Sequence, residues 1–129
     1  MKRAALQCAV AFVLAGLSCA AVAQDMVAVA GKQAKVLVDN DKVRIIEITV
    51  APGGSTGMHS HGDNIVVWIT PSDGEQTMAD GTKKPLHRKA GEVLYAGPVV
   101  HDTVNHGKNT TKAIVIELKD GTAAATAGK

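Results

Sequence analysis

The stretch that decides the fold is Gly53-Gly54-Ser55-Thr56-Gly57-Met58-His59-Ser60-His61. It follows a strongly β-branched run and places two histidines one residue apart. In a β-strand, residues two apart point to the same face of the sheet, whereas a helix would splay them. His59 and His61 therefore share one face if this segment is a strand. Two imidazoles on one face can bind a single ion, at about 2.0–2.1 Å for zinc.

The segments around this stretch carry the pattern of an all-β protein. Short apolar and β-branched runs end at turn signals such as Pro52-Gly53-Gly54 and Gly97-Pro98. About nine such runs lie between residues 36 and 119, and no segment of useful length has a helical period. Asp80-Gly81 indicates a hairpin, and Pro85 marks its second arm as an edge or bulged strand. The pattern predicts an all-β sandwich or small barrel.

The first residues predict export from the cell. Met1-Lys2-Arg3 is basic, residues 4–17 are mostly apolar, and the small residues that follow end in Ala-Val-Ala at Ala23. This order is typical of a secretory signal peptide, and the apolar run is shorter than the roughly 20 residues that a membrane anchor needs. We expect a secreted, periplasmic protein with a signal peptide at 1–23, an N-terminal arm at 24–35, one β-domain at 36–119 and a flexible tail at 120–129.

Cleavage after Ala23 changes the charge and the cysteine content. The whole chain has 14 lysines and arginines and 12 aspartates and glutamates, so the loss of Lys2 and Arg3 leaves a formal charge of zero. A neutral chain offers no basic face, so neither nucleic acid nor a membrane is expected as a partner. Both cysteines, Cys8 and Cys19, leave with the signal peptide. The fold must then be held by its core, helped by a metal or a partner chain.

A second histidine motif lies later in the chain. His101 follows the glycine at Gly91 and the break at Gly97-Pro98, and Asn105 comes shortly after it. The stretch from Gly53 to His61 resembles the first cupin motif, and the later one resembles the second. The likeness covers most of the β-domain and is strongest to the small single-domain, RmlC-like cupins, one member of which is associated with β-alanine degradation.

The resemblance implies a cupin-type conical antiparallel β-barrel, a double-stranded β-helix or jelly roll, that holds a divalent metal ion at its mouth. It places the ligands at His59, His61 and His101. The glutamate that the family has shortly after the second histidine is absent, because Ile65 stands there with Asn64 beside it. We expect a three-histidine site or one completed by another group. The candidates for an additional ligand, or for support of the histidines, are Asp63, Asn64, Gln76 and Asp102.

Three imidazoles with open coordination positions allow several functions. Zinc or copper is favoured because an exported chain acquires its metal outside the cytosol, where intrinsic affinity selects; iron, manganese and nickel stay open. A bound metal can act as a Lewis acid or activate water. By analogy with the fold, one hypothesis is a dioxygenase- or isomerase-like enzyme acting on a small carboxylate or dicarbonyl, and whether the protein is an enzyme stays open. The alternatives are a non-enzymatic module that binds a metal or small ligand, and a structural dimer with a vestigial site.

Both faces of the strand predicted at residues 65–70 are apolar. Its odd-numbered residues are Ile, Val and Ile, and its even-numbered residues are Val, Trp and Thr. A strand with one solvated face alternates with polar residues instead, so this pattern predicts burial on both sides. We expect a homodimer on one side, with Trp68 as its anchor. The predicted wall of the cavity consists of Ile65, Val67, Ile69 and Val104.

Overall fold

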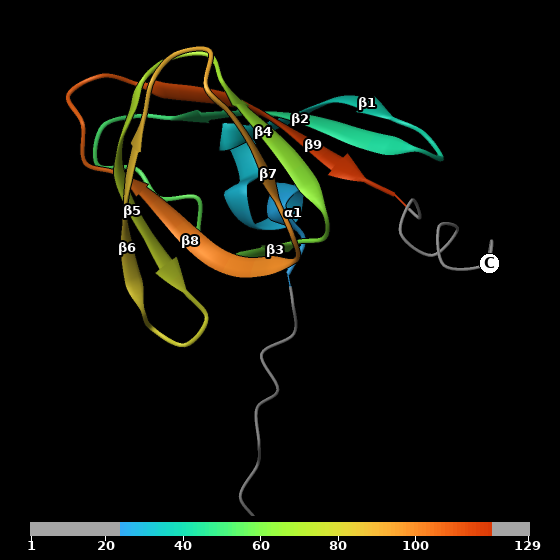
Figure 1. The fold of residues 1–129 in the computed structure, drawn as a ribbon, viewed down its shortest axis with the longest axis horizontal. Helices are drawn as coiled ribbons and strands as arrows, with labels where there is room; N and C mark the ends of the chain where they lie inside the picture. The colour runs from blue at the N-terminus through green and yellow to red at the C-terminus, as the bar shows by residue number, and fades with distance from the viewer. Residues whose placement is uncertain (1–23, 120–129) are drawn as a thin grey trace, which may run out of the picture.

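The computed structural model describes residues 24–119 (Figure 1). The predicted signal peptide and the predicted tail lie outside this range. Within it, a short helix and a 3-10 turn precede nine strands. The elements are α1 (Met26–Ala30), η1 (Gly31–Gln33), β1 (Ala34–Asp39), β2 (Val43–Val50), β3 (His59–His61), β4 (Asn64–Trp68), β5 (Ser72–Met78), β6 (Lys83–Arg88), β7 (Val93–Ala96), β8 (Val99–Asn105) and β9 (Thr111–Leu118).

The strands form two antiparallel sheets that face each other across a shared core (Figure 1). The larger sheet has the order β1-β2-β9-β4-β7, and the smaller has the order β3-β8-β5-β6. Strands far apart in the sequence pair directly, as β2 does with β9 and β3 with β8. Strand β6, which contains Pro85, lies at an edge, because proline cannot donate a ladder hydrogen bond. The all-β prediction is confirmed.

Alternation along the strands decides which side chains fill the core. From Ile46 to Val50, every second residue of β2 is buried, and the residues between them are only partly covered. The larger buried cluster joins β2, β9 and the helix, and consists of Met26, Ile46, Ile48, Val50 and Val115. A second cluster joins the two sheets and consists of Trp68, Leu86 and Ala113. Burial of such apolar side chains is the main favourable term in folding.

The orientation of β4 differs from the prediction. Asn64 and Trp68 are buried, so the even-numbered residues of the strand face the barrel interior. Trp68 is only 5 % exposed and packs against Leu86 from the opposite sheet. The prediction that Trp68 anchors a dimer interface is therefore wrong. Both faces of this strand are apolar, so the local pattern did not indicate which one points inward.

Residues 24–33, for which the sequence predicts only an arm, have defined structure. Asp25 caps α1, since its Oδ1 accepts the backbone N–H groups of Val27 and Ala28 at 3.0 and 3.2 Å. Met26 and Ala30 lie one turn apart and are both buried. An isolated helix of this length is unstable in water, so its burial against the barrel stabilises it. No helix among the described residues is long and apolar enough to cross a bilayer.

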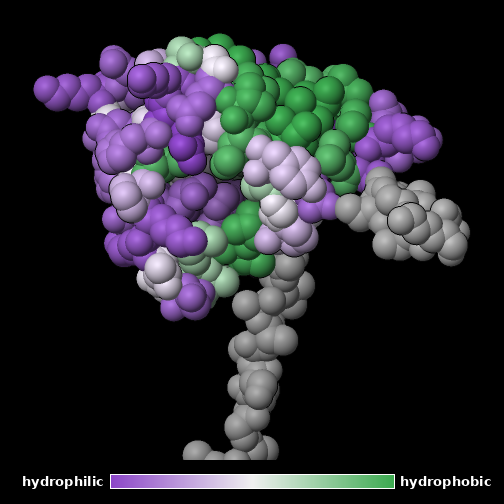
Figure 2. Space-filling model, in the orientation of Figure 1, coloured by the Kyte–Doolittle hydropathy of each residue, from purple (hydrophilic) through white to green (hydrophobic). Residues whose placement is uncertain are grey.

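The outer face of the larger sheet is also apolar. The strand register places five apolar residues in one row that crosses all five strands, namely Val38, Ile45, Ile116, Ile65 and Tyr95. Figure 2 shows hydrophobic side chains gathered on the side of the molecule where this sheet lies. Val38 and Tyr95, at the two ends of the row, are 41 % and 60 % exposed.

Candidate metal centre

Pairing of β3 with β8 brings the three predicted histidines together. His59 lies directly opposite His101, and His61 is two residues further along β3 on the same face. One ring nitrogen from each of the three side chains lies within 4.8 Å of the others. His59 and His61 are buried, and His101 is partly buried. The other two histidines, His87 and His106, are exposed elsewhere.

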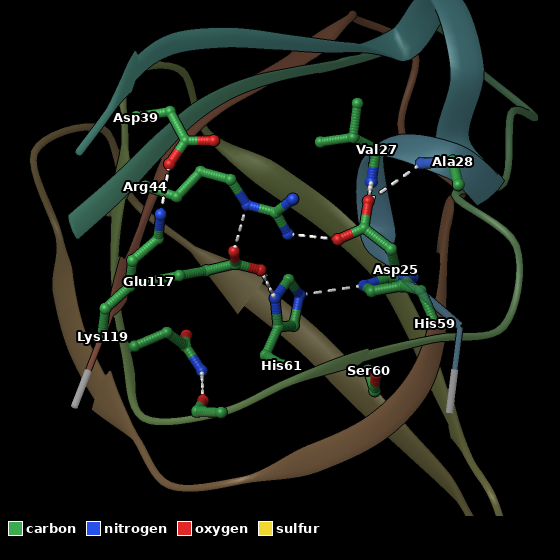
Figure 3. Close-up of polar contacts among 12 residues, drawn as sticks. Asp25, Val27, Ala28, Asp39, Arg44, His59, Ser60, His61, Glu117 and Lys119 are labelled. Carbon is green, nitrogen blue, oxygen red and sulfur yellow. Dashed lines mark hydrogen bonds and ion pairs between the residues drawn. The ribbon is translucent and has the colours of Figure 1, made fainter. Parts of the chain in front are cut away.

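Hydrogen bonds at Nδ1 orient the two rings of β3. The Nδ1 of His59 lies 2.7 Å from the carbonyl oxygen of Gly57. The Nδ1 of His61 lies 2.9 Å from Oε1 of Glu117 (Figure 3). A carbonyl and an ionised carboxylate only accept hydrogen bonds, so both Nδ1 atoms carry the proton and donate. Each Nε2 then presents a lone pair, which is the arrangement found in metal-ligating histidines.

The Nε2 atoms of His59 and His61 are 3.0 Å apart. With both protons on Nδ1, neither Nε2 can donate to the other, and two lone pairs face each other. A shared cation removes this repulsion. Two nitrogens bound to one zinc ion at about 2.0–2.1 Å are about 2.9–3.4 Å apart for angles between right-angled and tetrahedral. The residues present therefore fit a metal ion.

Burial keeps two of these rings uncharged. Removal from water lowers the pKa of His59, even though the Gly57 carbonyl favours its charged form. Burial also lowers the pKa of His101 to about 4, and the neighbouring rings of His59 and His61 add to this effect. Both imidazoles are therefore neutral near pH 7, which is the form that binds metals.

Glu117 on β9 is a site residue that sequence reasoning missed. Its Oε1 accepts the hydrogen bond from His61, and its Oε2 accepts one from Nε of Arg44 at 2.6 Å (Figure 3). Burial by itself raises the pKa of Glu117, but the hydrogen bonds from His61 and Arg44 hold it below its ordinary value. An ionised carboxylate behind a ligating histidine fixes the ring and raises its basicity.

The local sequence of β9 does not single out Glu117. The more apolar face of this strand, with Ile114, Ile116 and Leu118, looks like the core face, yet the face with Glu117 points inward. The cross-strand register determines which face of β9 points inward, because Glu117 pairs with Arg44 of β2 on one side and Asn64 of β4 on the other. The cupin motif has its glutamate at the start of β4. In this protein the carboxylate near the histidines comes instead from the neighbouring strand, β9.

The four predicted supporting residues divide into two pairs. Asn64 and Gln76 line the cavity together with the histidines, and their role as an additional ligand stays a prediction. Asp63 is not part of the cavity wall. Asp102 accepts hydrogen bonds from the hydroxyls of Ser55 and Thr56 on the side of β8 away from His101, because adjacent residues on a strand face opposite ways. Neither aspartate belongs to the histidine cluster.

A cavity of about 110 Å³ extends from the histidines into the barrel. Its wall includes Val66, Trp68, Leu94, Thr103 and Val115. This volume is smaller than the roughly 150 Å³ cavity that admits benzene, so the cavity suits only a small molecule.

The predicted cavity wall of Ile65, Val67, Ile69 and Val104 is wrong, because none of these side chains lines the cavity. On β4 the even-numbered residues point inward, and Ile69 is 49 % exposed. On β8 the inward residue is Thr103, which shares a face with His101. That residue could have been predicted from the two-residue period alone.

Chains of known structure share this architecture. No protein-family model and no curated protein matches the sequence. A cupin domain from Bordetella pertussis Tohama I is 27 % identical with a TM-score of 0.63, over 67 % of this chain and 91 % of that one. A Cupin 2 conserved barrel domain protein from Salinispora arenicola CNS-205 is 26 % identical with a TM-score of 0.53, over 72 % and 79 %. The polyketide cyclase RemF from Streptomyces resistomycificus is 20 % identical with a TM-score of 0.53, over 67 % and 66 %.

The fold is thus the cupin-type antiparallel β-barrel that the two histidine motifs predict. Its structural neighbours are cupins and RmlC-like double-stranded β-helix proteins. Inside it, three histidines are positioned to hold a metal ion. The finer resemblance, to the small cupins that include one associated with β-alanine degradation, stays a prediction.

Proposed function

We propose that this protein binds a divalent metal ion through His59, His61 and His101. One observation carries the proposal: the Nε2 atoms of His59 and His61 face each other at 3.0 Å while acceptors hold both Nδ1 atoms. Zinc and copper suit this nitrogen donor set best, with iron, manganese and nickel as the alternatives. A bound ion would supply Lewis acidity to an oxygen atom of a ligand.

Metal analysis of the purified chain and of single variants tests this assignment. We expect about one ion per chain in the unmutated protein, and only traces in His61→Ala and His101→Ala, because two imidazoles alone hold an ion weakly. His87→Ala and His106→Ala are matched controls, since both residues are exposed and outside the cluster. Equal metal content in His101→Ala and the unmutated chain would show that the site is misassigned.

The cavity beside the histidines favours a metal-dependent enzyme as the more specific function. A small carboxylate or dicarbonyl compound can turn its oxygens toward the histidines and rest its carbon atoms against Val66 and Leu94. Dioxygenase- and isomerase-like reactions are the classes that we propose. One similar structure is a polyketide cyclase by its name, but at 20 % identity the likeness concerns the fold alone.

Turnover separates the enzyme from a binding module. The metal-loaded protein is incubated with a panel of small carboxylates and dicarbonyls, with His101→Ala as the control, and both oxygen consumption and product are followed. Turnover that disappears in the variant supports the enzyme. Tight metal binding without turnover across the panel supports the non-enzymatic module instead.

We also propose that the protein acts in the periplasm, on the basis of the signal-peptide pattern at residues 1–23. Cleavage after Ala23 leaves the barrel intact, because its first element, α1, begins at Met26. Cell fractionation and N-terminal sequencing test this proposal. We expect a periplasmic chain that starts at Gln24, and a cytoplasmic chain that retains its first residues would contradict it.

A homodimer through the outer face of the larger sheet is our proposal for the quaternary structure. A twofold interface needs a surface that is complementary to itself, and the apolar row from Val38 to Tyr95 crosses the whole sheet without a charged residue. Charged residues on the same face include Lys35, Glu47 and Lys112, of which Glu47 and Lys112 form an ion pair of 3.6 Å. A second copy would therefore bury apolar surface without leaving that pair uncompensated.

A further inference from the structure

The segment of residues 24–30 contacts the strand that carries two of the histidines. Ser60, between His59 and His61, donates its backbone N–H to the carbonyl oxygen of Gln24 at 2.8 Å. Its hydroxyl donates to the same oxygen at 3.2 Å, and Asp25 forms an isolated parallel bridge with Ser60. Strand β3 has three residues and lies at the edge of its sheet, so this segment supports the edge that β8 does not cover.

A chain of ion pairs connects this segment to the ring of His61. Asp25 accepts a hydrogen bond from Arg44, Arg44 donates to Glu117, and Glu117 accepts from Nδ1 of His61 (Figure 3). The side chains of Arg44 and Glu117 are only 21 % and 13 % exposed, so water and salt screen this interaction weakly. The contact of Asp25 thus acts on a ligating ring through two intermediate groups.

A packing contact connects the same segment to the ring of His59. A Cβ atom at Gly57 would lie 2.5 Å from Cγ1 of Val29, so α1 approaches this glycine as closely as it can. Gly57 also has a φ of +76°, and its carbonyl oxygen is the acceptor for Nδ1 of His59. Helix α1 therefore packs on the residue that orients His59.

We propose that residues 24–30 form a strap whose docking is coupled to metal binding. The docked strap holds His59 and His61 with their Nε2 atoms turned toward a common ion, and the bound ion in turn keeps the strap docked. Met26, the buried anchor of the strap, also lines the cavity beside the histidines, so release of the strap opens that cavity. This inference rests on the proposed metal site and adds a positioning role for Asp25, Arg44 and Glu117.

Coupling between two sites is reciprocal, so it can be measured from either end. At the metal end, Asp25→Asn removes the charge that faces Arg44 but keeps the helix cap, because asparagine caps as well as aspartate. The matched control is Asp80→Asn, since Asp80 accepts the backbone N–H of Thr82 at 2.9 Å in a distant turn. We expect Asp25→Asn to weaken Zn²⁺ binding at least about fivefold in competition with a chelating dye. Asp80→Asn should leave it unchanged.

Glu117→Gln tests the hydrogen bond between Glu117 and the ring of His61. Substitution of a group that supports a ligating histidine lowers metal affinity by about 10- to 100-fold. The visible absorption of bound Co²⁺ should also shift in this variant, because the ring basicity of His61 changes. A loss of stability alone would not move that spectrum. An unshifted Co²⁺ spectrum together with unchanged affinity would exclude a positioning role for Glu117.

The converse effect is that bound metal should slow hydrogen exchange of the backbone amides that hold the strap in place. The amide of Ser60 donates to Gln24, and the amide of Val29 donates to the carbonyl of Asp25. We expect saturating Zn²⁺ to slow exchange at both amides at least about fivefold, the same range as the affinity effect, and to leave the amide of Thr82 unchanged.

A double variant shows whether Asp25 affects Zn²⁺ affinity through Arg44 or independently of it. If Asp25 acts through Arg44, the chain with both Asp25→Asn and Arg44→Gln loses no more Zn²⁺ affinity than Arg44→Gln alone. Additive losses would contradict the route. Unchanged affinity in Asp25→Asn with unchanged exchange at Ser60 would overturn the strap and leave the metal site standing. An unmutated chain that binds no divalent metal would overturn both.

Discussion

His101 makes the stability of the metal-free protein depend on pH. Burial lowers its pKa in the folded state to about 4, and the neighbouring rings of His59 and His61 add to the shift. In the unfolded chain a histidine titrates near pH 6.5. As the pH falls through about 6.5, the unfolded chain therefore takes up a proton that the folded chain does not, and the free energy of unfolding decreases. The loss begins near pH 6.5 and is complete near pH 4.

The size of this effect follows from the two pKa values. They correspond to about 2 kcal/mol of stability lost between pH 8 and pH 5. His101 is only partly buried, so screening by solvent reduces this to about 1–2 kcal/mol. Glu117 contributes little in this window. Its pKa is held below the ordinary value by His61 and Arg44 despite its burial, so its stabilising charge is lost at lower pH.

Urea unfolding of chelator-treated protein at pH 8 and pH 5 measures the effect. The unmutated chain should lose about 1–2 kcal/mol more than His101→Asn over this range. His106→Asn, which removes an exposed histidine, should behave like the unmutated chain. Equal pH dependence in the unmutated chain and in His101→Asn would refute the argument that His101 is buried in its neutral form.

Three further predictions follow from packing. Gly57→Ala should lower the free energy of unfolding by about 1–3 kcal/mol, and by more than Gly81→Ala, in chemical denaturation. Both glycines have positive φ, but a Cβ meets Val29 only at Gly57, so equal losses would contradict the close approach. Ile116→Lys should convert the proposed dimer to monomer in light scattering and leave the metal content unchanged, whereas a persisting dimer would exclude the outer face as the interface. Val66→Phe should fill the cavity and abolish binding of small ligands in calorimetry with the metal retained, and undiminished ligand binding would place the ligand elsewhere.

The positions of the strands could be read from the chain because their signals are local. Glycine, proline or aspartate ends most runs, and β-branched residues fill strands such as β2 and β9. Strand β5 is an exception, because Asp73 and Gly74 lie inside it. That His59 and His61 share one face follows from the two-residue period of a strand, whatever the rest of the fold. His101 could be added only through the resemblance of its segment to the second cupin motif.

Three features depended on contacts between distant segments. Which face of β4 points inward could not be read from a strand that is apolar on both sides, so Trp68 was misplaced as a surface residue. Helix α1 forms because the barrel buries Met26, and its sequence alone does not favour a helix. Glu117 reaches His61, 56 positions earlier in the chain, through the pairing of β9 with β2 and β4.

The sequence by itself thus determined the β-architecture and the shared face of His59 and His61, because period and turn chemistry act over a few residues. The resemblance to the second cupin motif added His101. Only the tertiary structure decided which groups orient those histidines. The carboxylate of Glu117, the guanidinium of Arg44 and the cap at Asp25 lie on separate elements. They become neighbours through sheet register, which long-range burial of apolar side chains selects and no local pattern encodes.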